Sequence, residues 1–154
     1  MDKSIEQRLA ELGVALPEAA APAANYVPFT RTGNLVMTAG QLPLKDGKLT
    51  ATGLLGQDID TATGQEAAKI CAINILAQAK AAIGDLAKIK RIVKITVFVA
   101  SAPGFVEQHL VANGASDFLV AALGDSGKHA RSAVGMAALP LNAPVEIEAV
   151  LEVE

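Results

Sequence analysis

The run from Val145 to Val153 restricts the fold of this chain more than any other segment. Valine, isoleucine, alanine or leucine fills every odd position, and glutamate fills positions 146, 148 and 152. Successive side chains of a β-strand point to opposite faces of a sheet, so this alternation predicts a strand with one buried face and one acidic face. The chain must therefore build a sheet that other elements cover on one side.

Two long apolar segments are expected to be the helices that cover this sheet. The first starts at Asp60 or Thr61 and ends near Ile83, and the second runs from Phe105 to Leu123. The β-branched run Ile89–Ala100 between them is typical of a buried strand. Further strands are expected over Tyr26–Thr30, Leu35–Thr38 and Ser132–Ala137, with turns at Thr32–Asn34 and Asp46–Gly47. This order predicts an α+β fold, a mixed sheet with two long helices packed on one face.

The first twenty or so residues are expected to form an extension outside this core. Ser4 followed by Gln7 matches a capping box, which predicts a helix over Ile5–Gly13. The proline- and alanine-rich segment Pro17–Ala24 is typical of an extended connector. Because 154 residues suit one domain of ordinary size, we predict a single domain, residues 1–154, with a helical extension over about residues 1–20.

Charge and hydropathy argue against several classes of partner. The formal net charge is −3, and lysine and arginine form no basic run, which disfavours nucleic acid as a partner. The N-terminus is charged and lacks the apolar core of a secretory signal, and no apolar run is long enough to span a bilayer. We therefore expect a cytoplasmic protein with no membrane partner.

The residues that bind metals or form disulfides are scarce. Cys71 is the only cysteine, and it is expected to be a buried, inert thiol. His109 and His129 are the only histidines and lie far apart in the sequence, so no metal site is expected. Since 51% of the residues are hydrophobic, an apolar interface between subunits is favoured.

The stretch from His129 to Ala149 contains the residues best suited to chemistry. Arg131 lies where a loop enters a predicted strand, and Glu146 begins the next strand after a connection bounded by prolines. If the two strands lie close, the guanidinium can bind a carboxylate through its planar fork while Glu146 holds or deprotonates a water. The alternative is an ordinary surface ion pair, worth under about 1 kcal/mol.

Three other polar residues are candidates for a functional role. His129 is expected to be a solvated loop residue, with a place at the mouth of a cleft as the alternative. Asn74 is expected to be a buried hydrogen-bonding residue. Ser132 has no suitably placed pair of histidine and aspartate partners nearby in the sequence, so a nucleophilic triad is unsupported.

Several segments resemble the RidA/YjgF family of reactive-imine deaminases, in the family's order. They are Tyr26–Val27, Gly33–Pro43, Gln65–Gly84, Ile92–Val99 and Arg131–Ala149, the last with its Leu139-Pro140 and Val145–Ala149 motifs. The resemblance covers most of the chain after the first twenty or so residues, and the N-terminal helix and Val111–Asp117 look like a longer subgroup. It implies a chorismate-mutase-like α+β fold and a homotrimer with clefts between adjacent subunits. It implies no metal or organic cofactor.

The same resemblance implies an activity, the hydrolysis of enamine and imine intermediates such as 2-aminoacrylate tautomers to 2-keto acids and ammonia. Arg131 falls on the family's carboxylate-binding arginine and Glu146 on its water-positioning glutamate. The implied substrate-binding residues are Tyr26 as an aromatic lining residue, Gly40 as a turn glycine whose backbone faces the ligand, Ala133, which contributes its backbone N–H, and Asn113.

The chain also departs from the family pattern. Ala39 stands where better-known members carry serine, Ala133 where they carry cysteine, and Ala112 where they carry a helix asparagine, with Asn113 one place away. These departures leave open a second function, a protein that binds small carboxylates without turnover. A third, an endoribonuclease or translation inhibitor, is opposed by the acidic charge.

Overall fold

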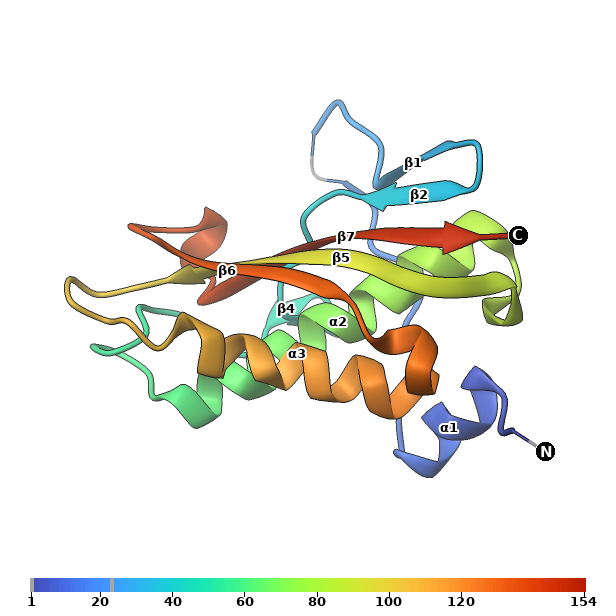
Figure 1. The fold of residues 1–154 in the computed structure, drawn as a ribbon. Helices are drawn as coiled ribbons and strands as arrows, with labels where there is room; N and C mark the ends of the chain where they lie inside the picture. The colour runs from blue at the N-terminus through green and yellow to red at the C-terminus, as the bar shows by residue number, and fades with distance from the viewer. Residues whose placement is uncertain (1, 23) are drawn as a thin grey trace.

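A five-stranded sheet forms the centre of the computed structural model, which describes residues 2–22 and 24–154 (Figure 1). The strands lie in the order β1 (Phe29–Thr32), β2 (Leu35–Thr38), β7 (Val145–Val153), β5 (Ile89–Ala100) and β6 (Ala130–Met136). Neighbours are antiparallel except β5 and β6, which are parallel. The predicted mixed sheet is therefore confirmed.

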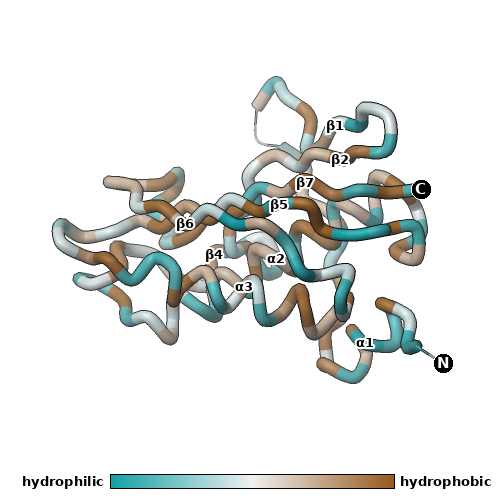
Figure 2. The backbone as a smooth tube through the Cα atoms, viewed as in Figure 1, coloured by the Kyte–Doolittle hydropathy of each residue, from teal (hydrophilic) through white to brown (hydrophobic). Residues whose placement is uncertain are grey.

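Two long helices, α2 (Thr61–Ile83) and α3 (Gln108–Leu123), pack against one face of this sheet (Figure 1). The odd-numbered residues of β7 are buried beneath α2, whereas Glu148 on the other face is exposed. Figure 2 shows both hydrophobic and hydrophilic positions along β5 and β7. The face away from the helices exposes three apolar side chains, Leu35, Met37 and Val134.

The ends of α2 follow from its sequence. The carboxylate of Asp60 accepts a hydrogen bond of 2.8 Å from the Thr63 N–H, which satisfies a free donor of the first turn. Gly84 ends the helix with a φ of +80°, a conformation that favours glycine. Both ends agree with the prediction.

The start of α3 was predicted wrongly. The helix begins at Gln108, three residues after Phe105, because the Phe105 N–H closes a turn onto the Ala102 carbonyl instead of entering the helix. Inside α3, Gly114 lies so close to α2 that a Cβ would be 2.0 Å from the Gln65 carbonyl oxygen. This glycine allows the two helices to approach each other.

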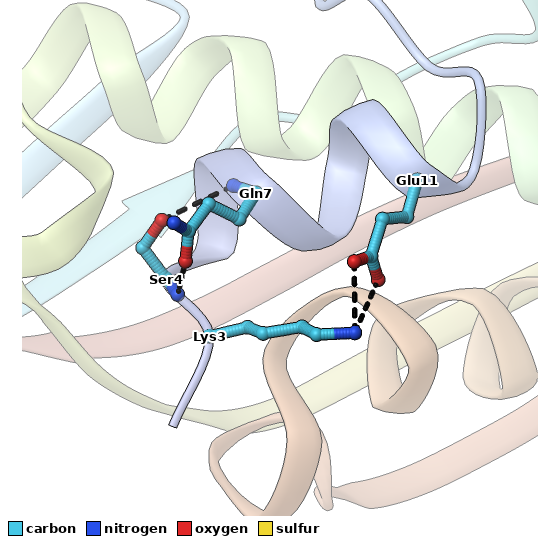
Figure 3. Close-up of polar contacts among 4 residues, drawn as sticks. All are labelled: Lys3, Ser4, Gln7 and Glu11. Carbon is cyan, nitrogen blue, oxygen red and sulfur yellow. Dashed lines mark hydrogen bonds and ion pairs between the residues drawn. The ribbon is translucent and has the colours of Figure 1, made fainter. Parts of the chain in front are cut away.

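The N-terminal extension contains the predicted helix, which ends at Glu11 and not at Gly13 and packs onto the core it was expected to lie outside. Helix α1 (Ile5–Glu11) starts at the predicted capping box, in which Ser4 Oγ accepts from the Gln7 N–H at 3.1 Å and Gln7 Oε1 accepts from the Ser4 N–H at 2.9 Å (Figure 3). Leu9 is buried, so the helix joins the core. The connector predicted over 17–24 has no helix or strand in its described residues, and Ala23 lies outside them.

Three smaller expectations need correction. Strand β1 begins at Phe29 and not at Tyr26, and β6 begins at Ala130 and ends at Met136, not at Ser132 and Ala137. The region around Asp46-Gly47, expected to be a loop with a turn, forms a small hairpin. Its strands are β3 (Leu44–Lys45) and β4 (Lys48–Leu49).

Short 3-10 turns complete the chain. They are η1 (Leu86–Lys88), η2 (Gly124–Gly127) and η3 (Pro140–Asn142). Within residues 2–22 and 24–154, no helix is both long enough and apolar enough to cross a bilayer.

Candidate functional site

The Arg131 side chain lies between β6 and α3. Its Cα pairs with that of Ile95 on β5, so it points to the same face as this buried isoleucine, toward the helices. Nη1 donates to Asn113 Oδ1 at 2.9 Å and to Ser116 Oγ at 3.1 Å, and Nη2 donates to the His109 carbonyl at 3.3 Å. Three contacts from one helix therefore hold the guanidinium in place.

All three acceptors around Arg131 are neutral. They are an amide, a hydroxyl and a backbone carbonyl, and Arg131 has no ion-pair partner among the described residues. A guanidinium carries five N–H donors, so two donors and the full positive charge remain for another group. This arrangement suits a planar anion such as a carboxylate.

Ser116 and the His109 carbonyl were not predicted to contact Arg131. The signal that could have found them is their spacing, because residues 109, 113 and 116 fall on one face of a helix. Asn113, predicted to bind substrate, lies in contact with the arginine that was predicted to bind it.

His129 is not the solvated loop residue that was expected. Its ring is partly buried, with Nε2 2.9 Å from Ser116 Oγ and Nδ1 2.5 Å from the Gly127 carbonyl oxygen. The histidine is thus joined to Arg131 through Ser116.

Glu146 lies on the opposite face of the sheet. It is the second residue of β7, between Val145 and Ile147, which are both buried under the helices. Its carboxylate rests over Gly40, where a Cβ would be 1.9 Å from Glu146 Oε2. Burial raises the pKa of Glu146, and the nearby charge of Glu148 raises it further, so its carboxylate is a stronger base than an exposed one.

The loop that carries Gly40 is fixed by backbone and side-chain contacts. Gln41 exchanges two backbone hydrogen bonds with Ile147, of 2.7 and 3.0 Å, which extends the edge of β2 along β7. Asn74 on α2 donates from Nδ2 to the Leu42 and Leu44 carbonyls, both at 3.0 Å. The prediction of a buried hydrogen-bonding Asn74 is confirmed. These contacts hold the loop beneath Glu146 in place.

Arg131 and Glu146 do not share a pocket within one chain, contrary to the expectation from their sequence positions. Strand β5 separates β6 from β7, with Arg131 beside Ile95 and Glu146 beside Phe98. The two side chains also point to opposite faces. The alternative of a direct ion pair is excluded for the same reason.

Tyr26 and Ala133 occupy two further separate places. Tyr26 is 54% exposed and lies three residues before β1, the strand at the sheet edge opposite β6. Ala133 lies on β6, beside Val97 and against the core. Two groups are therefore formed by contact, Arg131 with Asn113 and Glu146 with Gly40, and Tyr26 and Ala133 belong to neither.

Three surface hollows of the described chain lie away from both groups. These hollows, of about 360, 420 and 520 Å³, lie along the N-terminal extension, and neither Arg131 nor Glu146 lines them. No group of three or more His, Cys, Asp or Glu side chains in residues 2–22 and 24–154 is placed to hold a metal ion.

The fold and the sequence define the class of protein. Residues 6–152 match the family described as YjgF/chorismate mutase-like, putative endoribonuclease. The chain therefore belongs to the RidA/YjgF family, whose members include imine deaminases and putative endoribonucleases, and the predicted chorismate-mutase-like α+β fold is confirmed.

Individual relatives share most of the chain. Protein TCP17 of Trypanosoma cruzi is 47% identical over 149 residues, 96% of this chain and 93% of that protein. The crystal structure of Atu1372 from Agrobacterium tumefaciens, a protein of unknown function, is 59% identical with a TM-score of 0.92, covering 97% of this chain and 92% of that one. Escherichia coli TdcF with bound serine is 24% identical with a TM-score of 0.67, covering 99% and 100%, a likeness that shows the fold alone.

Proposed function

We propose that this protein hydrolyses small enamine or imine carboxylates of the 2-aminoacrylate type to 2-keto acids and ammonia, without a cofactor, in clefts between the subunits of a homotrimer. The observation that carries the proposal is the Arg131 guanidinium, held by neutral acceptors and lacking a counter-charge in the described chain. A substrate carboxylate supplies that charge. The serine bound to TdcF is a small carboxylate of this kind.

The reaction requires the protein to bind the substrate carboxylate and to deprotonate a water. Arg131 binds the carboxylate of the imine and so fixes the position of the imine carbon. Glu146 accepts a proton from a water, whose oxygen forms a bond to that carbon. Because the imine nitrogen is protonated at the start, this addition gives a neutral carbinolamine. Glu146 returns the proton to the nitrogen, the carbon–nitrogen bond breaks to release ammonia, and the hydroxyl proton passes to Glu146 and then to ammonia as the 2-keto acid forms. The raised pKa of Glu146 favours its role as the base.

A homotrimer accounts for the separation of the two groups of residues. One chain presents Glu146, Gly40 and Tyr26 away from Arg131, so a second chain is needed to complete the site. The exposed Leu35, Met37 and Val134 on the uncovered sheet face supply apolar surface for such an interface.

The activity is tested by measuring pyruvate and ammonia released from 2-aminoacrylate that a second enzyme generates in the assay. We expect release above the spontaneous rate with the wild type and none above it with Arg131→Ala. Arg91→Ala is the matched control, because Arg91 is exposed and pairs with Glu152. An Arg131→Ala variant as active as the wild type would remove Arg131 from the mechanism.

The site between subunits is tested by mixing inactive variants. When Arg131→Ala and Glu146→Ala chains are unfolded and refolded together in equal amounts, about one quarter of the clefts receive an intact arginine and an intact glutamate from different chains. Activity should return to about that fraction of wild type. Each variant refolded alone is the control, and a mixture that stays inactive contradicts the shared site.

Ala39 and Ala133 favour one rival, a protein of the same fold that binds a small carboxylate without turnover. The two alanines stand where better-known family members carry serine and cysteine. A thermal shift with 2-ketobutyrate, abolished in Arg131→Ala, together with no ammonia release, would support this rival. The endoribonuclease activity named in the family description is opposed by the net charge of −3.

A further inference from the structure

Ser116 and His129 extend the contacts of Arg131 into a chain of hydrogen bonds with one direction. Arg131 Nη1–H can only donate, so it donates to Ser116 Oγ at 3.1 Å. The Gly127 carbonyl can only accept, so His129 Nδ1, 2.5 Å away, must carry a proton. Ser116 Oγ lies 2.9 Å from His129 Nε2, and its hydroxyl proton is free to be donated there.

A neutral histidine ring is one state that fits these contacts. A neutral ring protonated at Nδ1 has a lone pair on Nε2, which accepts the Ser116 hydroxyl proton. The guanidinium, the hydroxyl, the imidazole and the Gly127 carbonyl then each bond to the next with no donor facing a donor. Arg131 Nη1 and His129 Nε2 lie at most 6.0 Å apart, because each contacts the Ser116 hydroxyl oxygen. An uncharged ring adds no electrostatic repulsion to the guanidinium at this distance.

We infer that Ser116 and His129 are positioning residues that fix the orientation of the Arg131 guanidinium for its carboxylate ligand, with His129 acting only through Ser116. The carboxylate ligand in this inference rests on the proposed function. The hydrogen-bond chain does not depend on that function.

The physical role follows from the flexibility of arginine. A long side chain loses rotamer freedom when it binds a ligand, and a guanidinium already held in place loses less of it on binding. Ser116 and Asn113 engage Nη1, and the His109 carbonyl engages Nη2, which leaves Nε–H and one Nη2–H for a ligand. Removing the hydroxyl frees one Nη1 hydrogen and loosens the guanidinium.

The hydrogen-bond chain is tested without any ligand by nitrogen NMR of the intact protein. In the wild type we expect a neutral His129 ring protonated at Nδ1, and Arg131 Nη signals that are separate because rotation of the guanidinium is slow. Ser116→Ala should merge or broaden the Arg131 signals, whereas Ser126→Ala, a serine substitution in the nearby turn η2, should not. Identical Arg131 signals in the wild type and Ser116→Ala would overturn the inference.

Its effect on the site is tested by kinetics and by binding of 2-ketobutyrate. Because the carboxylate is held equally before and during reaction, Ser116→Ala should raise KM and the ketobutyrate Kd about tenfold while kcat changes less than about threefold. His129→Ala should act in the same direction, and the double variant should be no worse than Ser116→Ala alone.

The outcomes separate this inference from the proposed function. Effects of Ser116→Ala and His129→Ala that add, or a Kd unchanged in Ser116→Ala while Arg131→Ala loses binding, overturn the inference and leave the carboxylate site standing. A wild type that neither binds ketobutyrate nor releases ammonia refutes the proposed function, and the NMR result then decides the hydrogen-bond chain.

Discussion

Replacing Gly40 by alanine should displace the Glu146 carboxylate and leave the backbone where it is. Gly40 does not have the positive φ that favours glycine, so its backbone accepts a side chain. The obstacle is Glu146, since the new Cβ would lie 1.9 Å from Oε2, 2.8 Å from Cδ and 3.0 Å from Cγ. Ordinary contacts begin near 3.4 Å, so the carboxylate oxygen must withdraw by about 1.5 Å.

That displacement sets the expected size of the effect. A catalytic group misplaced by about 1 Å can lower the rate about 100-fold, so kcat/KM for imine hydrolysis should fall by about that factor. KM should change little because Arg131 is untouched. The free energy of unfolding should change by no more than about 1 kcal/mol, because the displaced group is the end of a flexible side chain.

The assay compares four proteins, the wild type, Gly40→Ala, Glu146→Ala and the double variant, by ammonia release and by urea unfolding. With Glu146 shortened to alanine the new methyl meets no carboxylate, so Gly40→Ala should then change kcat/KM by less than about twofold. If Gly40→Ala alone keeps the wild-type kcat/KM, Glu146 does not need its place over Gly40 and the reasoning is refuted.

Three further predictions concern the charges and packing of the described structure. Because burial raises the pKa of Glu146 in the separate chain, the native state holds this proton more tightly than the unfolded chain; in the Arg131→Ala background, where no partner guanidinium opposes this shift, the Tm advantage of adding Glu146→Gln should grow as pH rises from about 4 to 7, and a constant difference would contradict it. Asn113→Asp keeps an acceptor beside Arg131 but adds a competing negative charge, so the Kd for 2-ketobutyrate, measured by calorimetry, should rise at least about tenfold. Gly114→Ala would bring a Cβ to 2.0 Å from the Gln65 carbonyl oxygen, and urea unfolding should show a loss of about 1–3 kcal/mol despite the better helix propensity of alanine.

The elements that could be predicted best are those with a strong periodic pattern and clear end signals. Strands β5 and β7 and helix α2 have the predicted bounds, because alternation, β-branched content, Asp60 and Gly84 each act locally. The start of α3 and the bounds of β1 depend on backbone hydrogen bonds to distant or turn residues. The Phe105 N–H, for example, bonds to Ala102, which no propensity encodes.

The sequence allows candidate site residues to be named, but it does not predict how they are arranged. Arg131 and Glu146 stand out in the sequence, yet their relation depends on which strand lies between β6 and β7. A strand has a period of two, so a register difference decides the face on which a side chain lies. The contacts of Arg131 with Asn113 and Ser116 likewise required knowing that α3 packs beside β6.

The two halves of the proposed site carry opposite charges that are not balanced within one chain. Arg131 keeps a positive charge that its neutral acceptors do not balance, and Glu146 is a carboxylate whose pKa burial and Glu148 both raise. A guanidinium of a neighbouring subunit near Glu146 would lower that pKa again and keep the carboxylate ionised as a base. The substrate carboxylate takes up the Arg131 charge in turn, so ligand binding would raise the basicity of Glu146 when the water must be deprotonated. In the proposed trimer, assembly and substrate would therefore shift the pKa of Glu146 in opposite directions.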